Sequence, residues 1–234
     1  MIKNLIQSIF KKYDLQLIRY SKTDEFRIIN LLEKHNIDTI IDCGANNGLY
    51  GKNLRELGFE GRIISFEPIK SLYLELEKNA KYDDLWSVNN YGLGDYDGTA
   101  KINISQNMSS SSLLNIIPSH VNSEPKSKII KTEEVIIKKL STVFDKFNLN
   151  QKLIYLKLDV QGYEDKVLDG AEDVIKIIKG IQIEMSLIPL YYKSILLPEM
   201  INRLNNYEFK LMGILPVFWD QKMKNFSDFM IRIY

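Results

Sequence analysis

Residues 40–48 read Ile40-Ile-Asp-Cys-Gly-Ala-Asn-Asn-Gly48, a short β-branched run that passes directly into a glycine-rich turn. Such a run is typical of a buried strand, and a helical pattern over residues 49–57 follows it. Ligands bind at strand-to-helix junctions of this kind in open α/β sheets. Gly44 would let a ligand approach the backbone closely, and Asp42 at the strand tip could face an ammonium group. The free N–H groups of the helix could meet a carboxylate, so the junction suits an amino acid better than a pyrophosphate.

Strands and helices alternate along the rest of the chain. Patterning predicts helices at residues 24–36, 71–79, 164–178 and 198–205. It predicts strands at residues 61–68, 86–91, 134–140, 153–159 and 181–185, and a closing antiparallel pair at 209–215 and 229–234. This alternation favours a mostly parallel sheet with helices on both faces. We therefore predict a Rossmann-like α/β fold in a single domain over residues 37–234, after an N-terminal helical extension over residues 1–36.

The middle of the chain departs from this alternation over about residues 95–133. Asp97-Gly98 is a hairpin signal, and residues 99–105 alternate as a half-exposed strand does. The polar, serine-rich stretch 106–131 is long for a loop inside a compact domain, and such loops are either functional or disordered. We expect an insert with a β-hairpin and a loop that acts as a lid or contacts substrate, with simple disorder as the alternative.

The first 20 residues carry apolar side chains at helical spacing, with lysines between them. The pattern predicts an amphipathic helix that packs on the domain or on a second subunit, or one that lies on a membrane surface. The segment lacks the continuous apolar core and cleavage site of a secretory signal. No apolar run approaches the roughly 20 residues needed to span a bilayer, so no transmembrane segment is expected.

Composition narrows the function classes further. Lys and Arg number 31 against 30 Asp and Glu, which argues against a nucleic-acid partner held by phosphate contacts. The single cysteine, Cys43, excludes an internal disulfide framework and fits a reducing compartment, so we expect a cytoplasmic location. With His35 and His120 as the only histidines, a multi-histidine metal centre within one chain is excluded.

Two further motifs lie where the ribose and the base of a nucleoside would bind. Glu67, in Phe66-Glu-Pro68, ends the second predicted strand 25 residues after Asp42. An acidic residue at that place can accept hydrogen bonds from both hydroxyls of a ribose. Gly94 and Asp95 follow the third strand, where Asp95 could accept from an adenine amino group or could simply hold the next turn in register.

A last group of residues could carry chemistry. Asp159 ends a predicted buried strand in Leu156-Lys-Leu-Asp-Val-Gln-Gly-Tyr-Glu164, and Glu184 ends the next strand. Each carboxylate could serve as a general base, both could share a divalent cation, or each could cap a neighbouring helix. His120, in the polar insert, could act as a base after loop closure or could be merely solvated. Three tyrosines could stack on a sugar or serve in packing: Tyr163, Tyr191 and Tyr192.

These motifs, in this order, resemble those of the FkbM family of S-adenosylmethionine-dependent methyltransferases, from about Thr39 to the C-terminus. The resemblance rests on IDCGANNG, GRIISFEP, GLGDYDG, SSSSLL, LKLDVQGYE with VLDGA after it, and IEMS followed by PLY. It implies the class I methyltransferase fold, a seven-stranded sheet whose last strand is antiparallel. It also implies that the methionine part of the cofactor lies on Asp42, Gly44, Asn46 and Gly48, its ribose on Glu67 and its adenine edge on Asp95. Asp159 and Glu184 would face the methyl-transfer site.

The resemblance implies an S-adenosylmethionine-dependent O-methyltransferase whose acceptor is a hydroxyl of a sugar, a glycan or a related metabolite. Cys43 stands where the family commonly has a small or aliphatic residue, and the C-terminal segment around Trp219-Asp220 and Ser227-Asp228 matches loosely. Three alternatives remain: the same reaction assisted by a divalent cation at the two carboxylates, a lapsed enzyme that serves as an interaction module, and a nicotinamide oxidoreductase. The last lacks the expected G-x-G-x-x-G motif.

Overall fold

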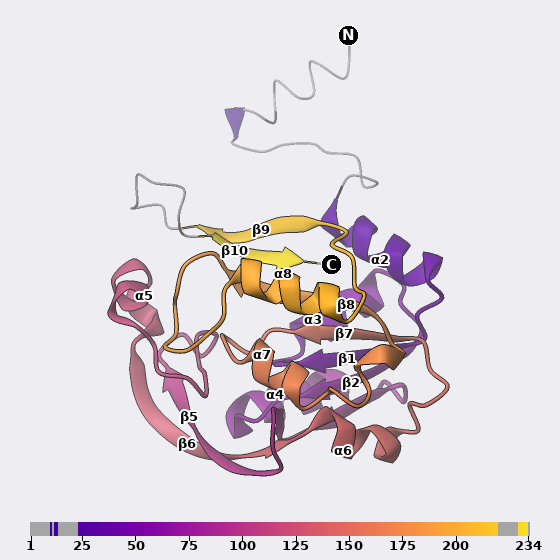
Figure 1. The fold of residues 1–234 in the computed structure, drawn as a ribbon, viewed down its shortest axis with the longest axis horizontal. Coiled ribbons are helices and arrows are strands. Elements are labelled where there is room, and N and C mark those ends of the chain that lie inside the picture. The colour runs from indigo at the N-terminus through magenta and orange to yellow at the C-terminus, as the bar shows by residue number, and fades with distance from the viewer. Residues whose placement is uncertain (1–9, 11, 14–22, 220–228, 234) are drawn as a thin grey trace.

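A seven-stranded sheet forms the centre of the computed structural model, which describes residues 10, 12–13, 23–219 and 229–233 (Figure 1). The strand order is β3-β2-β1-β7-β8-β10-β9. Five strands pair in parallel, namely β3 (Trp86–Asn89), β2 (Arg62–Phe66), β1 (Thr39–Cys43), β7 (Ile154–Leu158) and β8 (Ile178–Ser186). The antiparallel part consists of β10 (Phe229–Ile233), which pairs with both β8 and β9 (Ile214–Trp219). The helix predicted over residues 1–20 lies, except for residues 10 and 12–13, outside the described residues.

Helices cover both faces of the sheet because successive strand residues point to opposite sides. Ile40 and Ile63 pack in one apolar cluster with α2 (Asp24–Lys34), α3 (Leu49–Glu56) and α4 (Lys70–Ala80). Ile41 and Ile64, one residue further along each strand, pack in the other cluster with α6 (Leu140–Phe144), α7 (Glu164–Asp169) and α8 (Leu197–Asn206). Strands that are buried on both faces explain the continuous apolar runs in the sequence.

The insert forms a second, three-stranded sheet with the order β4-β6-β5. Its strands are β4 (Gly92–Leu93), β5 (Gly98–Ser105) and β6 (Ile129–Lys138). The connection between β5 and β6 holds the short helix α5 (Pro118–Ser123) and the 3₁₀ turn η2 (Pro125–Ser127). Three consecutive serines in this connection, Ser110 to Ser112, are buried, so the serine-rich stretch packs against the domain instead of extending into solvent.

The structure corrects three details of the predicted elements. Asp97-Gly98 does not close a hairpin, because β4 and β5 on either side of it do not pair with each other. Gly98, at the start of β5, pairs with Ile137 near the end of β6. Asp97 instead accepts from the Lys139 N–H and the Thr142 hydroxyl, both at 2.8 Å, and so holds the start of α6. The helix expected over residues 164–178 ends at Asp169.

Close packing explains the early end of α7. A side chain at Gly170, the residue that caps the helix, would lie 1.8 Å from the carbonyl oxygen of Gly94. The chain turns there, forms the 3₁₀ helix η4 (Ile175–Ile177) and enters β8, while its apolar residues continue into the same core. Similarly, β9 begins later than predicted, because Phe209 packs on the core cluster instead of joining the sheet. None of the helices in the described ranges is long and apolar enough to cross a membrane.

Candidate functional site

A pocket of about 230 Å³ opens at the carboxyl ends of the parallel strands, between the main sheet and the insert. The main sheet contributes the loop after β1, the end of β2 and the tips of β7 and β8, while the insert contributes β5, β6 and the serine-rich stretch. Of the residues that the sequence analysis selected for the cofactor and for catalysis, five line this pocket: Gly44, Asn46, Glu67, Asp159 and Glu184. The topology thus brings residues up to 140 positions apart to one edge of the sheet.

Glu67 is a buried carboxylate at the end of β2. Its Oε2 accepts from the N–H of Asn46 at 2.8 Å and its Oε1 accepts from the N–H of Ile69 at 2.9 Å. Burial raises the pKa of Glu67 to about 7, against the lowering effect of these two hydrogen bonds. Each carboxylate oxygen has a second lone pair, so Glu67 can still accept from two vicinal hydroxyls in the pocket.

The turn after β1 requires glycine at position 44. Gly44 has a φ of +72°, and a Cβ there would lie 1.9 Å from the carbonyl oxygen of Asp159. The loop after β1 therefore lies directly against the tip of β7. Gly48 has a φ of +87° and caps α3, with Leu76 close to its Cα, and it does not line the pocket.

Lys157 is a site residue to which the sequence analysis gave no role. Its ammonium is buried beneath the loop after β1, 3.0 Å from Asp42 and 3.6 Å from Asp159, and it donates to the Gly44 carbonyl at 2.9 Å. Burial lowers the pKa of Lys157, but the two aspartates outweigh this effect and hold it above its ordinary value. The fully buried Asp42 thus faces an ammonium of the chain itself and not the pocket. A lysine in an otherwise apolar strand was the available signal.

Asp159 belongs to a hydrogen-bonded chain that reaches the insert. The Gln161 amide donates to Asp159 Oδ1 at 2.8 Å, and the Tyr191 hydroxyl donates to Gln161 Oε1 at 2.8 Å. The Ser112 hydroxyl donates to the Gln161 carbonyl at 2.7 Å. Of the three tyrosines expected either to stack on a sugar or to serve in packing, Tyr191 is a buried structural link. Tyr192 is mostly exposed, and Tyr163 lines the pocket.

Left-handed backbone conformations occur at the same pocket. Three non-glycine residues that line it have left-handed φ angles: Asn46 at 52°, Met108 at 61° and Gln161 at 56°. Such conformations cost energy and persist where the surroundings impose them, which is common at ligand-binding sites.

Glu164, the last residue of the LKLDVQGYE motif, fixes the turn that carries Asp159. Its carboxylate is buried and accepts from the N–H groups of Val160 at 3.0 Å and Gly162 at 3.2 Å. Burial raises the pKa of Glu164 to about 8. Glu164 lies in the first turn of α7 and also clamps the loop after β7.

Besides Asp42 and Gly48, three predicted residues lie away from the pocket lining. Gly94 and Asp95 are not part of it, and Asp95 accepts from the Tyr163 hydroxyl at 3.1 Å. His120 lies in α5, buried, with its ring 5.4 Å from that of Tyr191. His120 is therefore neither a solvated loop residue nor a lining residue of this pocket. Burial lowers the pKa of His120.

The described residues contain no group of three or more His, Cys, Asp or Glu side chains that could hold a metal ion. At the tip of β7, the cation beside Asp159 is the Lys157 ammonium. The structure therefore gives no support to the divalent-cation alternative.

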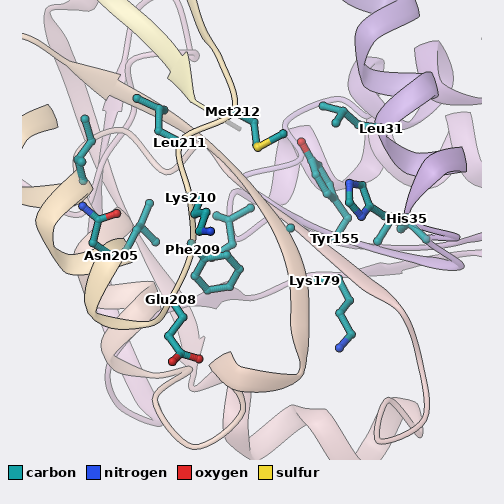
Figure 2. A pocket seen from close by; sticks show the side chains of 15 residues that line it. Leu31, His35, Tyr155, Lys179, Asn205, Glu208, Phe209, Lys210, Leu211 and Met212 are labelled. Carbon is teal, nitrogen blue, oxygen red and sulfur yellow. The ribbon is translucent and has the colours of Figure 1, made fainter.

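A second pocket, of about 290 Å³, lies at the opposite, amino-terminal ends of β7 and β8 (Figure 2). Its walls come from α2, α8 and residues 208–212, with the apolar side chains of Leu31, Phe209 and Met212 among those that line it. None of the side chains predicted for the cofactor or for catalysis lines this second pocket. We therefore place the candidate site at the carboxyl ends of the strands.

Comparison with known proteins identifies a family that the chain resembles over most of its length. A family model described as the methyltransferase FkbM domain matches residues 42–211, the part of the chain that builds the pocket. A curated relative, Methyltransferase 1 of Beauveria bassiana (strain ARSEF 2860), is 25% identical over 145 residues, which cover 57% of this chain and 58% of that protein. The matched part thus spans less than two thirds of the relative's length.

Solved structures with a similar arrangement include two at low sequence identity. A SAM-dependent methyltransferase from Aquifex aeolicus is 12% identical, with a TM-score of 0.44 over 97% of this chain and 96% of that chain. TehB from Haemophilus influenzae is 10% identical, with a TM-score of 0.46 over 95% of this chain and 63% of that chain.

Proposed function

The chain belongs to the FkbM methyltransferase family, whose model matches residues 42–211, and we propose that it is an S-adenosylmethionine-dependent O-methyltransferase. The acceptor that we propose is a hydroxyl of a sugar, a glycan or a related metabolite. One observation carries the proposal. The same pocket is lined by Glu67, a buried carboxylate that can accept hydrogen bonds from ribose hydroxyls, and by the carboxylates Asp159 and Glu184. A cytoplasmic location stays a prediction.

The residues present suit this cofactor. Glu67 has free lone pairs for two hydroxyls, and the backbone at Gly44 is open to close approach because it lacks a side chain. Apolar side chains line the other side of the pocket, as an adenine ring requires. The N–H groups that begin α3 follow the same loop and could receive a carboxylate. When bound, S-adenosylmethionine supplies a methyl group on a sulfonium.

The chain's own residues would then have three tasks. They bind the acceptor so that its hydroxyl oxygen lies in line with the methyl carbon, since such alignment lowers the barrier to the displacement. They exclude water, which the insert helps to do by covering the pocket. They also take the hydroxyl proton as the C–O bond forms and the C–S bond breaks. Asp159 is our first choice for this base and Glu184 the second, because both carboxylates line the pocket.

Calorimetric titration with S-adenosylhomocysteine tests the cofactor assignment. Wild type should bind in the micromolar range, about −8 kcal/mol, and Glu67→Ala should bind at least tenfold more weakly. Glu60→Ala is the matched control, because Glu60 is an exposed glutamate outside the pocket lining and should leave binding unchanged. The absence of binding to wild type, with and without sugar acceptors, would contradict the proposal and favour the interaction module.

Transfer of a labelled methyl group to a panel of sugars and glycans tests the acceptor. Asp159→Asn should abolish transfer while S-adenosylhomocysteine still binds, because the amide keeps the shape of the carboxylate but accepts no proton. Retention of full activity in Asp159→Asn would assign the base to Glu184 instead.

A further inference from the structure

Gln161 has a backbone conformation that its side chain does not favour. Its φ of 56° lies in the left-handed region, which glycine adopts freely and other residues rarely adopt. Gly162 follows with a φ of 93°, so the loop after β7 turns through two left-handed residues in succession. Strain of this kind persists where the surrounding contacts impose it, and it is common at functional sites. The contacts of Gln161 therefore indicate why glutamine stands there.

Three hydrogen bonds impose this conformation. The amide nitrogen of Gln161 donates to Asp159 Oδ1 at 2.8 Å, and the amide oxygen accepts from the Tyr191 hydroxyl at 2.8 Å. The main-chain carbonyl of Gln161 accepts from the Ser112 hydroxyl at 2.7 Å. Gln161 thus connects the tip of β7 both with the insert and with the connection between β8 and α8.

The insert fixes the position of Tyr191, although this residue lies in the connection between β8 and α8. Ile116 and Tyr191 form an isolated antiparallel β-bridge, and the N–H of Tyr192 donates to the Asn115 carbonyl at 2.9 Å. His120 of α5 packs its ring edge-on against the Tyr191 ring, with 5.4 Å between the centroids. The hydroxyl that binds the Gln161 amide is therefore placed by backbone pairing and ring packing with the insert.

Asp159 is the carboxylate that this series of contacts reaches. Its side chain lines the pocket and is 28% exposed, so a ligand can approach it. Its Oδ1 is held by the Gln161 amide, and its Oδ2 lies 3.6 Å from the Lys157 ammonium. A carboxylate has about four lone-pair directions, and contacts at both oxygens fix the plane of the group. The lone pairs that remain then have a fixed direction relative to a ligand in the pocket.

We propose, on the basis of the proposed function, that Gln161 is a positioning residue that aligns Asp159 for proton removal, and that the insert controls this alignment through Tyr191. The proton passes from the acceptor hydroxyl to Asp159 as the oxygen bonds to the methyl carbon and the C–S bond breaks. The base must lie within hydrogen-bond reach of that proton, and a misplacement of about 1 Å can lower a rate about 100-fold. The insert thus serves the base as well as covering the pocket.

Gln161→Gly tests the positioning role without adding backbone strain. Relief of the left-handed residue offsets the lost hydrogen bonds, so the thermal midpoint should stay within about 4 °C of wild type. In the labelled-methyl assay, kcat should fall at least about tenfold, while S-adenosylhomocysteine binding should be unchanged. Asn148→Gly is the matched control, because Asn148 is exposed, has a φ of 54° and lies outside the pocket lining. Normal kcat in Gln161→Gly would overturn the proposal and leave the proposed function intact.

Two further variants make the test decisive. Gln161→Asn tolerates the left-handed region but is one methylene shorter, so it cannot bond to Asp159 and Tyr191 at once. It should show the same loss of kcat if the glycine variant does not fold, and normal kcat would overturn the proposal. Tyr191→Phe should also lower kcat, whereas Gln161→Gly/Tyr191→Phe should be no slower than Gln161→Gly, because Tyr191 acts through Gln161. Additive losses would overturn the role of the insert.

A crystal structure of Gln161→Gly separates this proposal from the proposed function. The Asp159 carboxylate should leave its wild-type rotamer or occupy more than one, and this readout needs no acceptor. A single, unchanged rotamer would overturn the proposal. If wild type binds no S-adenosylhomocysteine, the proposed function fails, and the role of Gln161 in proton removal fails with it.

Discussion

Lys157→Met isolates the charge that holds the two central strands of the site together. The side chain of Lys157 runs under the loop after β1, and its ammonium lies 3.0 Å from Asp42 Oδ1. Asp42 is fully buried, and its other oxygen accepts from the Ser65 hydroxyl at 3.1 Å. Methionine keeps the length and apolar character of the lysine stem, so the substitution removes the charge with little loss of packing.

The expected loss follows from the geometry of this pair. Two unit charges 3.0 Å apart attract by about 5.5 kcal/mol at an effective dielectric constant of about 20. Part of that attraction only repays the burial of the ammonium, while the carboxylate that stays behind is left uncompensated. Removal of one partner of a buried pair costs about 3–5 kcal/mol. For a domain of this size the thermal midpoint should fall by roughly 6–20 °C.

Urea unfolding followed by circular dichroism measures this loss. Lys152→Met, at an exposed lysine, is the control and should change stability by less than about 0.5 kcal/mol. The double variant Asp42→Asn/Lys157→Met removes both charges and should recover at least about 2 kcal/mol relative to Lys157→Met, because no buried charge is left unpaired. If the double variant is no more stable than the single one, packing and not charge explains the loss, and the reasoning is refuted.

Three further predictions concern the pocket. Gly44→Ala should lower the free energy of unfolding by more than about 3 kcal/mol and abolish S-adenosylhomocysteine binding, since its Cβ would lie 1.9 Å from a carbonyl oxygen. Gly58→Ala is the control: its φ is positive but no atom lies within 4 Å of the added Cβ, so the loss in the same urea titration should be only about 1–2 kcal/mol. The pKa of Glu67 is raised to about 7 from 4.5, so its contribution to the free energy of unfolding is full below pH 4.5 and is lost as the pH rises through 7. Glu67→Gln should remove about 3 kcal/mol of this pH dependence. An unchanged slope of unfolding free energy against pH would contradict the assignment. Tyr191→Phe leaves the partly buried Gln161 amide oxygen without its hydroxyl donor and should lower the free energy of unfolding by about 1–3 kcal/mol. Tyr192→Phe, at a mostly exposed side chain, should be neutral within about 0.5 kcal/mol, and equal losses would show that the hydrogen bond is not the cause.

The fold was largely predictable because its signals are local. The apolar run before Gly44 and the strand–helix alternation identified the parallel part of the sheet, since buried strands and amphipathic helices carry distinct periods. Element ends were less predictable where contact with a distant segment sets them. α7 stops where Gly170 meets the Gly94 carbonyl, and no pattern within residues 164–178 records that contact.

The site was predictable to the extent that strand tips define it. Glu67, Asp159 and Glu184 follow or end strands of one parallel sheet, whose carboxyl ends share an edge, and all three line the pocket. The ammonium that Asp42 faces could not be identified in this way. Its partner Lys157 lies 115 residues away in sequence and becomes its neighbour only because β1 pairs with β7.

By itself, the sequence determined the order of strands and helices, the residues at each strand tip and the motifs of the family, because each depends on neighbouring residues. Tertiary structure alone decided which of these side chains face the pocket and which form ion pairs or contacts with other residues of the chain. It turned Asp42 inward to Lys157, buried His120 against Tyr191, and brought Ile137 of the insert to the pocket beside Glu67. The physical reason is that a buried polar or charged group must find a partner, and strand pairing and close packing between distant segments supply that partner.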